Sequence, residues 1–407
     1  MSLLPVEEAL RRVLASIDEP TAAEMVGLRE SAGRTLARDL KALRTQPPFA
    51  ASAMDGYAVR AADLAAVPAE LAVVGRSVAG AGFAGAVGPG QAVRIFTGAP
   101  IPPGADAIVI QENAEAQADR VLVRAPVDPG RFVRPGGLDF REGDGLLAAG
   151  ARLDAGALAL AAAMGHARLP VRRKPRVAIL ATGDELVWPG EAVGPDQIVA
   201  SNMFALAAMV EKAGGAPIDL GIARDTVEAL DSAIDSAVAQ QADLLVTLGG
   251  ASVGDHDLVQ AAFGRRGMEL GFWRVALRPG KPMIHGRLGP MRILGLPGNP
   301  VSSIVCAILF VVPALRACLG DADAGADPTE PAVLGRDLAL NDGRQDYLRA
   351  SLAPGRDALP TATPFAAQDS SMLALLARSE ALVVRPPLAP ASRAGDPCRM
   401  IRLSGFL

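Results

Sequence analysis

The stretch LLVTLGGASVGDHD (244–257) decides the fold, because an apolar run long enough for a buried strand passes directly into a glycine-rich, acidic loop. Two other segments have the same form: VAILATGDEL (177–186) and MRILGLPGNPVSS (291–303). Two segments with helical spacing of apolar residues, 201–215 and 226–238, lie before residue 244. Strands that alternate with helices are joined by right-handed crossovers. The sequence therefore predicts a doubly wound, mostly parallel sheet.

Three further parts surround this α/β region. Apolar residues at Val6, Leu10, Val13 and Ile17 predict an amphipathic opening helix that packs on another element. Proline and glycine interrupt short apolar runs in the next hundred residues, which is typical of a β-rich module, and an Ala/Leu-rich segment follows. We therefore predict a multidomain α/β plus β protein with a split helical platform at 1–44 and 141–173, an inserted β-rich domain at 45–140, the doubly wound α/β domain at 174–322 and a C-terminal β domain at 323–407.

Composition excludes several classes of protein. Of 407 residues, 50% are hydrophobic and 21% are charged, and the formal net charge is −4, which favours a soluble globular protein and disfavours a nucleic-acid binder. The three histidines are far apart and the three cysteines form no close pair, so we expect no zinc or iron–sulfur site. Any metal should be a hard cation held by carboxylates. Sparse cysteines also favour a reducing compartment, and we expect a cytoplasmic protein.

No membrane segment is expected. Charged residues such as Glu7 and Arg11 stand where a signal peptide would need an apolar run. The most apolar segment, 301–319, contains Pro313 and Arg316, so its uninterrupted apolar run is shorter than the ~20 residues of a membrane span. We interpret this segment as a buried helix.

Three glycine-rich loops each follow a predicted buried strand: TGDEL (182–186), GGASVGDHD (249–257) and LPGNPVSS (296–303). Ligands of open parallel sheets bind beyond the carboxyl ends of the strands. The backbone N–H groups of these loops, with hydroxyls such as those of Thr182 and Ser302, could cradle a phosphate. Each loop alone could be an ordinary turn before a helix, but the three together favour a binding site.

The same loops carry four carboxylates that would repel a phosphate: Asp184, Glu185, Asp255 and Asp257. A divalent cation between the carboxylates and the phosphate removes this repulsion. We therefore infer that a magnesium ion bridges carboxylate and phosphate oxygens. Asp184 or Asp255 taken alone could instead be a solvated turn residue.

Positive charge comes from the motif RPGKP (278–282). The chain has only four lysines, so lysine at position 281 suggests that a compact ammonium suits this site better than a guanidinium fork, although an ordinary surface lysine is the alternative. In the β-rich module, FAASAMDGYAVR (49–60) contains Asp55 and Gly56, a pair that most often forms only a turn.

Six motifs in this order resemble those of the molybdopterin molybdenumtransferase family: SAMDGYAVR (52–60), RIFTGAPIPPGADAIV (94–109), LATGDEL (180–186), LGGASVGDHD (248–257), RPGKP (278–282) and GLPGNPVSS (295–303). The resemblance spans nearly the whole chain and extends to the E domain of gephyrin. It implies the same four-part plan, with a C-terminal domain like a β-barrel. It also implies that molybdenum from molybdate is inserted into adenylylated molybdopterin, with magnesium-dependent release of AMP.

The resemblance also implies roles for individual residues. The active-site positions would be Asp55, Thr97, Glu185, Asp225, Asp257 and Lys281, of which Asp55, Glu185 and Asp257 would hold the metal. The substrate-binding positions would be Asp139, Thr182, Gly183, Gly249, Gly250, Ser252, Gly254, Arg278, Pro297, Gly298, Asn299, Ser302, Arg349 and Ser370. Among these, Arg278, Lys281, Arg349 and Ser370 resemble an oxyanion pocket for molybdate.

Three positions depart from the family pattern. Arg278 stands where the family commonly has lysine, and its bidentate fork would change how molybdate is held. His256 stands where tyrosine or alanine is common. It is either a residue without a role in a polar loop or a pH-sensitive neighbour of the metal. The stretch before Asp139 contains PGG in place of a basic sequence.

The resemblance implies a homodimer in which the inserted module of one subunit faces the α/β domain of the other, so that Asp55 acts in trans. Molybdopterin adenylyltransferase and molybdoenzyme maturation proteins are the other partners it suggests, with no nucleic acid and no membrane. Two alternatives stay open: an adenylyltransferase, which is disfavoured by the presence of SAMDGYAVR (52–60) and the β modules, and a gephyrin-like scaffold, which is disfavoured because the acidic motif positions are filled.

Overall fold

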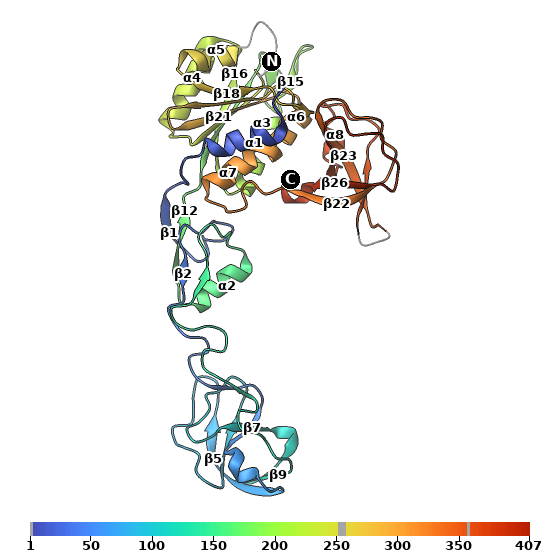
Figure 1. The fold of residues 1–407 in the computed structure, drawn as a ribbon. Coiled ribbons are helices and arrows are strands. Elements are labelled where there is room, and N and C mark those ends of the chain that lie inside the picture. The colour runs from blue at the N-terminus through green and yellow to red at the C-terminus, as the bar shows by residue number, and fades with distance from the viewer. Residues whose placement is uncertain (1–2, 251–257, 356–358) are drawn as a thin grey trace.

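The computed structural model describes residues 3–250, 258–355 and 359–407. The molecule is elongated (Figure 1). The α/β domain and the C-terminal β domain lie at one end, the inserted module lies at the other, and the platform connects them.

The α/β domain is built on a sheet with the strand order β16-β13-β17-β21-β20-β18. The first four strands are mutually parallel, and β20 is antiparallel to both of its neighbours, β21 and β18. Its strands are β13 (Arg176–Thr182), β16 (Ala216–Ala223), β17 (Leu244–Leu248), β18 (Glu269–Trp273), β20 (Ile284–Leu288) and β21 (Met291–Leu296), with a small parallel pair β14 (Leu186–Val187) and β15 (Ile198–Val199). Its helical segments are α3 (Asn202–Lys212), α4 (Val227–Ala239), α5 (Leu258–Arg265), α6 (Pro300–Cys306), the π segment η3 (Ala307–Val311) and α7 (Val312–Cys318).

Side chains of β13 alternate between two cores, because successive residues of a strand point to opposite faces. Val177, Ile179 and Ala181 pack in the cluster with α3, α6, η3 and α7, whereas Ala178 and Leu180 pack in the cluster with α4 and α5. Helices thus cover both faces of the sheet. The prediction of a doubly wound, mostly parallel sheet is confirmed.

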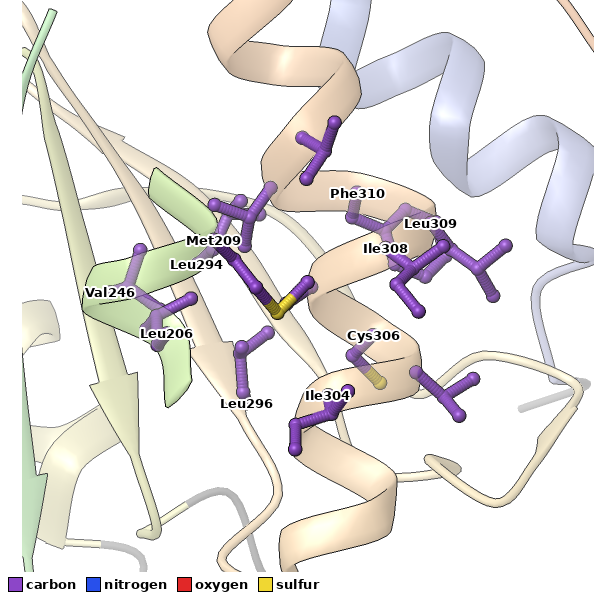
Figure 2. Close-up of a cluster of buried hydrophobic side chains, with 14 of the residues drawn as sticks. Leu206, Met209, Val246, Leu294, Leu296, Ile304, Cys306, Ile308, Leu309 and Phe310 are labelled. Carbon is purple, nitrogen blue, oxygen red and sulfur yellow. The ribbon is translucent and has the colours of Figure 1, made fainter. Parts of the chain in front are cut away.

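The most apolar segment is a core helix. The continuous helix Pro300–Cys318 is long and apolar enough to cross a membrane, but 83% of its most apolar window is buried inside the protein. Figure 2 shows Ile308 and Phe310 of this helix packed near Met209 of α3 and Leu294 of β21. The prediction of a buried helix is confirmed.

The opening helix α1 (Val6–Ala15) departs from the predicted division of domains. Its buried residues Val6, Ala9 and Val13 belong to the core of the α/β domain, although the division at 1–44 assigns them to the platform. The amphipathic pattern predicted an apolar face that must dock, but it carries no information about which surface receives that face.

The platform is less helical than predicted. It has one helix, α2 (Ala155–Ala163), and two antiparallel strand pairs, β1 (Ala23–Gly27) with β12 (Arg168–Arg172) and β2 (Leu40–Lys41) with β11 (Gly145–Leu147). Its core joins residues from both chain segments, among them Leu36 and Met164. The Ala/Leu-rich composition predicted a helical platform, but Asp154 caps the start of α2 and Gly165, at φ +99°, follows its end, so the helix has nine residues.

The inserted module is a β domain with the strand order β7-β4-β6-β5-β9-β8. These strands are β4 (Gly56–Val59), β5 (Ala69–Ser77), β6 (Gln91–Ile95), β7 (Ala107–Ile110), β8 (Ala114–Gln117) and β9 (Arg120–Val123), with the short turns η1 (Ala61–Leu64) and η2 (Gln111–Asn113). A pair of short strands, β3 (Ala51–Ser52) and β10 (Val133–Arg134), lies where the chain enters and leaves the module.

The C-terminal domain is a barrel, because β23 pairs with both β24 and β25 and thereby closes the order β23-β24-β22-β26-β25. The strand β19 (Leu277–Arg278) of the preceding region adds to this barrel in parallel with β23. The remaining bounds are β22 (Thr329–Leu334), β23 (Gln345–Ala353), β24 (Thr361–Pro364), α8 (Leu373–Leu376), β25 (Ala381–Arg385), β26 (Pro397–Arg402) and η4 (Leu403–Gly405).

Substitution Phe310→Ala should lower the free energy of unfolding by about 3–5 kcal/mol, because it leaves a cavity in the centre of the α/β core. The matched control Leu340→Ala, at a side chain that is 70% exposed, should stay within about 0.5 kcal/mol of wild type. Urea unfolding followed by circular dichroism measures both. A loss below about 1 kcal/mol for Phe310→Ala would contradict the assignment of a core helix.

Candidate active site

A cleft of about 640 Å³ lies at the carboxyl ends of the parallel strands. Nine predicted site residues belong to its wall: Thr182, Gly183, Glu185, Asp225, Gly249, Gly250, Pro297, Gly298 and Asn299. The wall also contains Ala181, Leu186, Ile198, Val199, Ala200, Ser201, Asn202, Met203, Leu248, Pro282, Pro300 and Ser371.

Strand register brings the three glycine-rich loops together. Ala181 of β13 lies opposite Leu248 of β17, and Leu248 lies opposite Leu296 of β21. The next residue of each strand, Thr182, Gly249 or Pro297, therefore begins its loop beside the other two. Segments that are far apart in the sequence thus form one continuous floor.

Two glycines allow this close approach of the backbone. Gly183 has φ +147°, and a Cβ there would lie 2.3 Å from a carboxylate oxygen of Glu185. Gly249 has φ +103°, and a Cβ there would lie 2.6 Å from the backbone oxygen of Thr182. A side chain at Gly249 would clash with the backbone of the first loop, so these two loops can meet only with glycine there, whereas at Gly183 the positive φ is what disfavours other residues.

Polar groups are available at the floor of the cleft. The hydroxyl oxygen of Thr182 is buried and has no hydrogen-bond partner among the described residues. The side-chain amide of Asn202 donates to the backbone oxygen of Gly298 at 2.7 Å, and the amide of Asn299 donates to the hydroxyl of Ser370 at 3.0 Å. The two amide bonds fix the 297–299 turn, and the Thr182 hydroxyl stays unpaired within the described part of the chain.

Negative charge gathers at one side of the cleft. The pKa of Asp225 is raised, first by partial burial and then by the charges of Asp184 and Glu185. Partial relief comes from Arg224, which lies 4.0 Å from Asp184. A group of carboxylates that raises the pKa of one of its own members is a favourable place for a cation.

Three predicted residues of the second loop, Ser252, Gly254 and Asp257, lie outside the described residues, as does His256. Within the described ranges, no three His, Cys, Asp or Glu side chains form a group that could hold a metal. The described carboxylates in the cleft wall are Asp225 and Glu185.

Asp55 and Thr97 do not reach this cleft within the same chain. Both belong to the inserted module, at the opposite end of the molecule (Figure 1). They do lie together, because the backbone N–H and the hydroxyl of Thr97 donate to Asp55 at 2.7 and 2.8 Å. These two bonds hold the pKa of Asp55 below its ordinary value. Asp139 is exposed in the segment that leads from the module back to the platform.

The RPGKP motif reaches the cleft through Pro282. Lys281 is exposed beside it, whereas the guanidinium of Arg278 bonds to groups of the C-terminal domain. Ser302 is buried at the start of α6, one residue after Val301, whose backbone N–H donates to the backbone oxygen of Ser370 at 3.1 Å.

Arg349 is only 1% exposed, and its guanidinium holds a segment of the C-terminal domain. It donates to the side chain of Gln368 and to the backbone oxygens of Asp369 and Met372 at 3.3, 2.9 and 3.2 Å. That segment carries Ser370 and Ser371, the latter in the cleft wall. In this structure Arg349 therefore acts on the cleft by placing these serines.

Three family models match successive parts of the chain. Residues 4–165 match the MoeA N-terminal region (domain I and II), residues 178–317 match the probable molybdopterin binding domain, and residues 331–403 match the MoeA C-terminal region (domain IV). A molybdopterin molybdenumtransferase of a Nostoc species is 39% identical over 84% of this chain and 79% of its own length. The chain belongs to the molybdopterin molybdenumtransferase family. The resemblance drawn from the six motifs is confirmed.

Other members of the family agree over nearly the full length. The molybdopterin molybdenumtransferase of Bacillus subtilis is 35% identical over 94% of this chain and 90% of its own length. The crystal structure of a molybdopterin biosynthesis MoeA protein from Pyrococcus horikoshii has a TM-score of 0.84 and 29% identity, and it covers 98% of this chain and 99% of that one. The predicted fold class and the prediction of a transferase of molybdenum cofactor biosynthesis are confirmed.

One part of this molybdenumtransferase cleft was not predicted. Residues from β15 and the first turn of α3, between Ile198 and Met203, form much of one wall. The sequence signal was the start of a helix shortly after the first glycine-rich loop, which places that helix end at the same edge of the sheet. The spacing of apolar residues predicts only a helix from residue 201, so Asn202 is not among the predicted site residues.

The raised pKa of Asp225 predicts a pH-dependent stability. Because the folded chain holds this proton more tightly than the unfolded chain, the stability that Asp225 confers falls as pH rises from its ordinary pKa of 3.8 through the raised value. Asp225→Asn should therefore raise the unfolding temperature at pH 7, and the gain should shrink as pH falls toward 4. Thermal unfolding between pH 4 and 8 measures this.

The matched control is Asp235→Asn. The pKa of Asp235 is lowered by its hydrogen bond with Arg266, so this substitution should lower the unfolding temperature at pH 7. A loss of stability in Asp225→Asn at neutral pH would contradict the charge repulsion inferred at the cleft.

Proposed function

We propose that this chain inserts molybdenum from molybdate into adenylylated molybdopterin and releases AMP. The observation that carries the proposal is the cleft in which three backbone loops and two carboxylates meet. Water cleaves the phosphoanhydride that joins AMP to the pterin phosphate. Molybdenum bonds to the two dithiolene sulfurs, and the oxygen that molybdate loses leaves as water with the thiol protons. The reaction needs donors for phosphate, oxygen ligands for a divalent ion and cations for the oxyanion.

Phosphate recognition is supported by two helix starts. The first residues of α3 and of the helix Pro300–Cys318, Asn202 and Pro300, both belong to the cleft wall. Helix amino termini carry partial positive charge and free N–H groups, which favour anions. The volume of about 640 Å³ lies within the range of pockets for small organic ligands.

The carboxylates fit magnesium. Asp225 and Glu185 are hard oxygen donors in one wall, close enough for the charge of Glu185 to raise the pKa of Asp225. When bound, the ion would neutralise phosphate oxygens as the phosphoanhydride breaks. The residues of this chain would hold the ion, and the loop N–H groups would orient the phosphates.

The oxyanion would bind where the RPGKP turn meets the C-terminal domain. Lys281 is exposed at this turn, and Ser370 is held above α6 by bonds to Asn299 and Val301. Lys281→Ala should weaken the response to molybdate more than nucleotide binding, because it removes the one ammonium of the motif. The molybdate concentration that gives half-maximal AMP release measures the weaker response. An unchanged concentration would show that Lys281 is an ordinary surface residue.

A second copy of the chain would complete the site. Asp55 is half-buried and held by Thr97 in a module that lies at the far end of its own chain. The same module exposes Phe49 and Met54 at 43% and 38%, which supports contact with another protein surface. The family plan, in which Asp55 acts in trans, agrees with this arrangement.

We place the enzyme in the cytoplasm because its cysteines are free thiols, and molybdopterin adenylyltransferase would supply its substrate.

The activity is tested by incubating the purified protein with adenylylated molybdopterin and magnesium, with and without molybdate. We expect AMP release that molybdate stimulates, together with a product that activates a molybdoenzyme lacking its cofactor. Tight binding of the pterin nucleotide without AMP release under any divalent ion would favour a scaffold of the gephyrin type and would refute the carboxylate roles.

The shared site is tested by mixing two inactive variants, Asp55→Asn and Asp225→Asn. If Asp55 acts in trans, a mixed dimer has one intact site, so an exchanged equimolar mixture should recover about one quarter of wild-type activity. Each variant alone should remain inactive. Subunit exchange is verified first. If the exchanged mixture is still inactive, Asp55 and Asp225 either act in a site formed by one chain or have separate roles.

A further inference from the structure

The C-terminal domain already binds the guanidinium of Arg278, so this side chain is not free to bind an oxyanion. Its guanidinium donates to Asp346, to Asp342 at 3.2 Å and to the side-chain oxygen of Asn341 at 3.1 Å. The backbone supports the same contact, since Arg278 of β19 lies opposite Asp346 in the parallel pairing with β23. The charge of Arg278 is therefore already matched by two carboxylates.

The two carboxylates differ in their surroundings. The side chain of Asp346 is 4% exposed, and its second oxygen has no hydrogen-bond partner among the described residues. Asp342 is 44% exposed and is shared with Arg344 at 2.7 Å. If Arg278 turned toward another anion, buried Asp346 would lose its counter-ion, which costs far more than the loss of an exposed pair.

We propose that Asp342 and Asp346 compete with the oxyanion for Arg278 and thereby set the molybdate affinity of the site. This inference rests on the proposed function and concerns the control of that function. Lys281, three residues further along the same turn, makes no such pair within the described residues and remains the available cation. Oxyanion binding is thus coupled to the contact between the RPGKP turn and the C-terminal domain.

The test measures molybdate binding to the full-length protein by calorimetry and the molybdate dependence of AMP release. Asp346→Asn should tighten molybdate binding about tenfold and Asp342→Asn about threefold, because each removes a competing charge and leaves a neutral side chain of the same shape. The half-saturating concentration should fall while kcat changes little. The matched control Asp327→Asn, which breaks the exposed pair with Arg399 in the same domain, should leave binding unchanged.

A double substitution separates competition from a structural effect. The gain of Asp346→Asn should disappear when Arg278→Gln is added, since the released guanidinium is what binds the anion. If Asp346→Asn fails to fold, the same comparison is made with Asp342→Asn, alone and combined with Arg278→Gln, because Asp342 is exposed. Unchanged or weaker molybdate binding in the folded aspartate variants would overturn the competition, whereas wild-type protein without any AMP release would overturn the proposed function itself.

Discussion

The whole arrangement depends on the burial of a four-stranded parallel sheet between two layers of helices. Because Val246 and its neighbours on β17 are covered on both faces, the register of the central strands cannot slip without exposing apolar side chains. That register places Ala181, Leu248 and Leu296 in one row. The ends of three strands therefore fall at one level, and the loops that follow them meet.

The cleft above this row combines groups that repel one another. Loop N–H groups and helix starts favour anions, whereas Asp225 and Glu185 favour cations. The pKa of Asp225 is raised first by its partial burial and then by repulsion from the neighbouring acidic residues. Such a combination is unfavourable in the empty protein and becomes favourable when a phosphate and a divalent ion arrive together. Under the proposed function, the arrival of a metal-bound nucleotide would offset this repulsion.

The C-terminal barrel takes part in the site through polar contacts. Arg278 contacts Asp346 across the boundary, and Arg349 holds the segment that brings Ser371 to the cleft wall. Without these contacts, the C-terminal domain could move and carry its serines away from the cleft. Among the residues that the structure describes, the inserted module makes no such contact with the cleft of its own chain, and it carries the Asp55–Thr97 pair at the far end of the molecule.

By itself the sequence determined the doubly wound sheet, the buried helix 300–318 and the glycine-rich loops, because strand and helix periods and the need for glycine are local properties. Only the tertiary structure decided where α1 docks, that strand pairs join the two chain segments of the platform, and that Asn202 belongs to the wall. It also decided that Arg278 is paired with Asp346. These features depend on which distant segments meet, and local patterns carry no information about that.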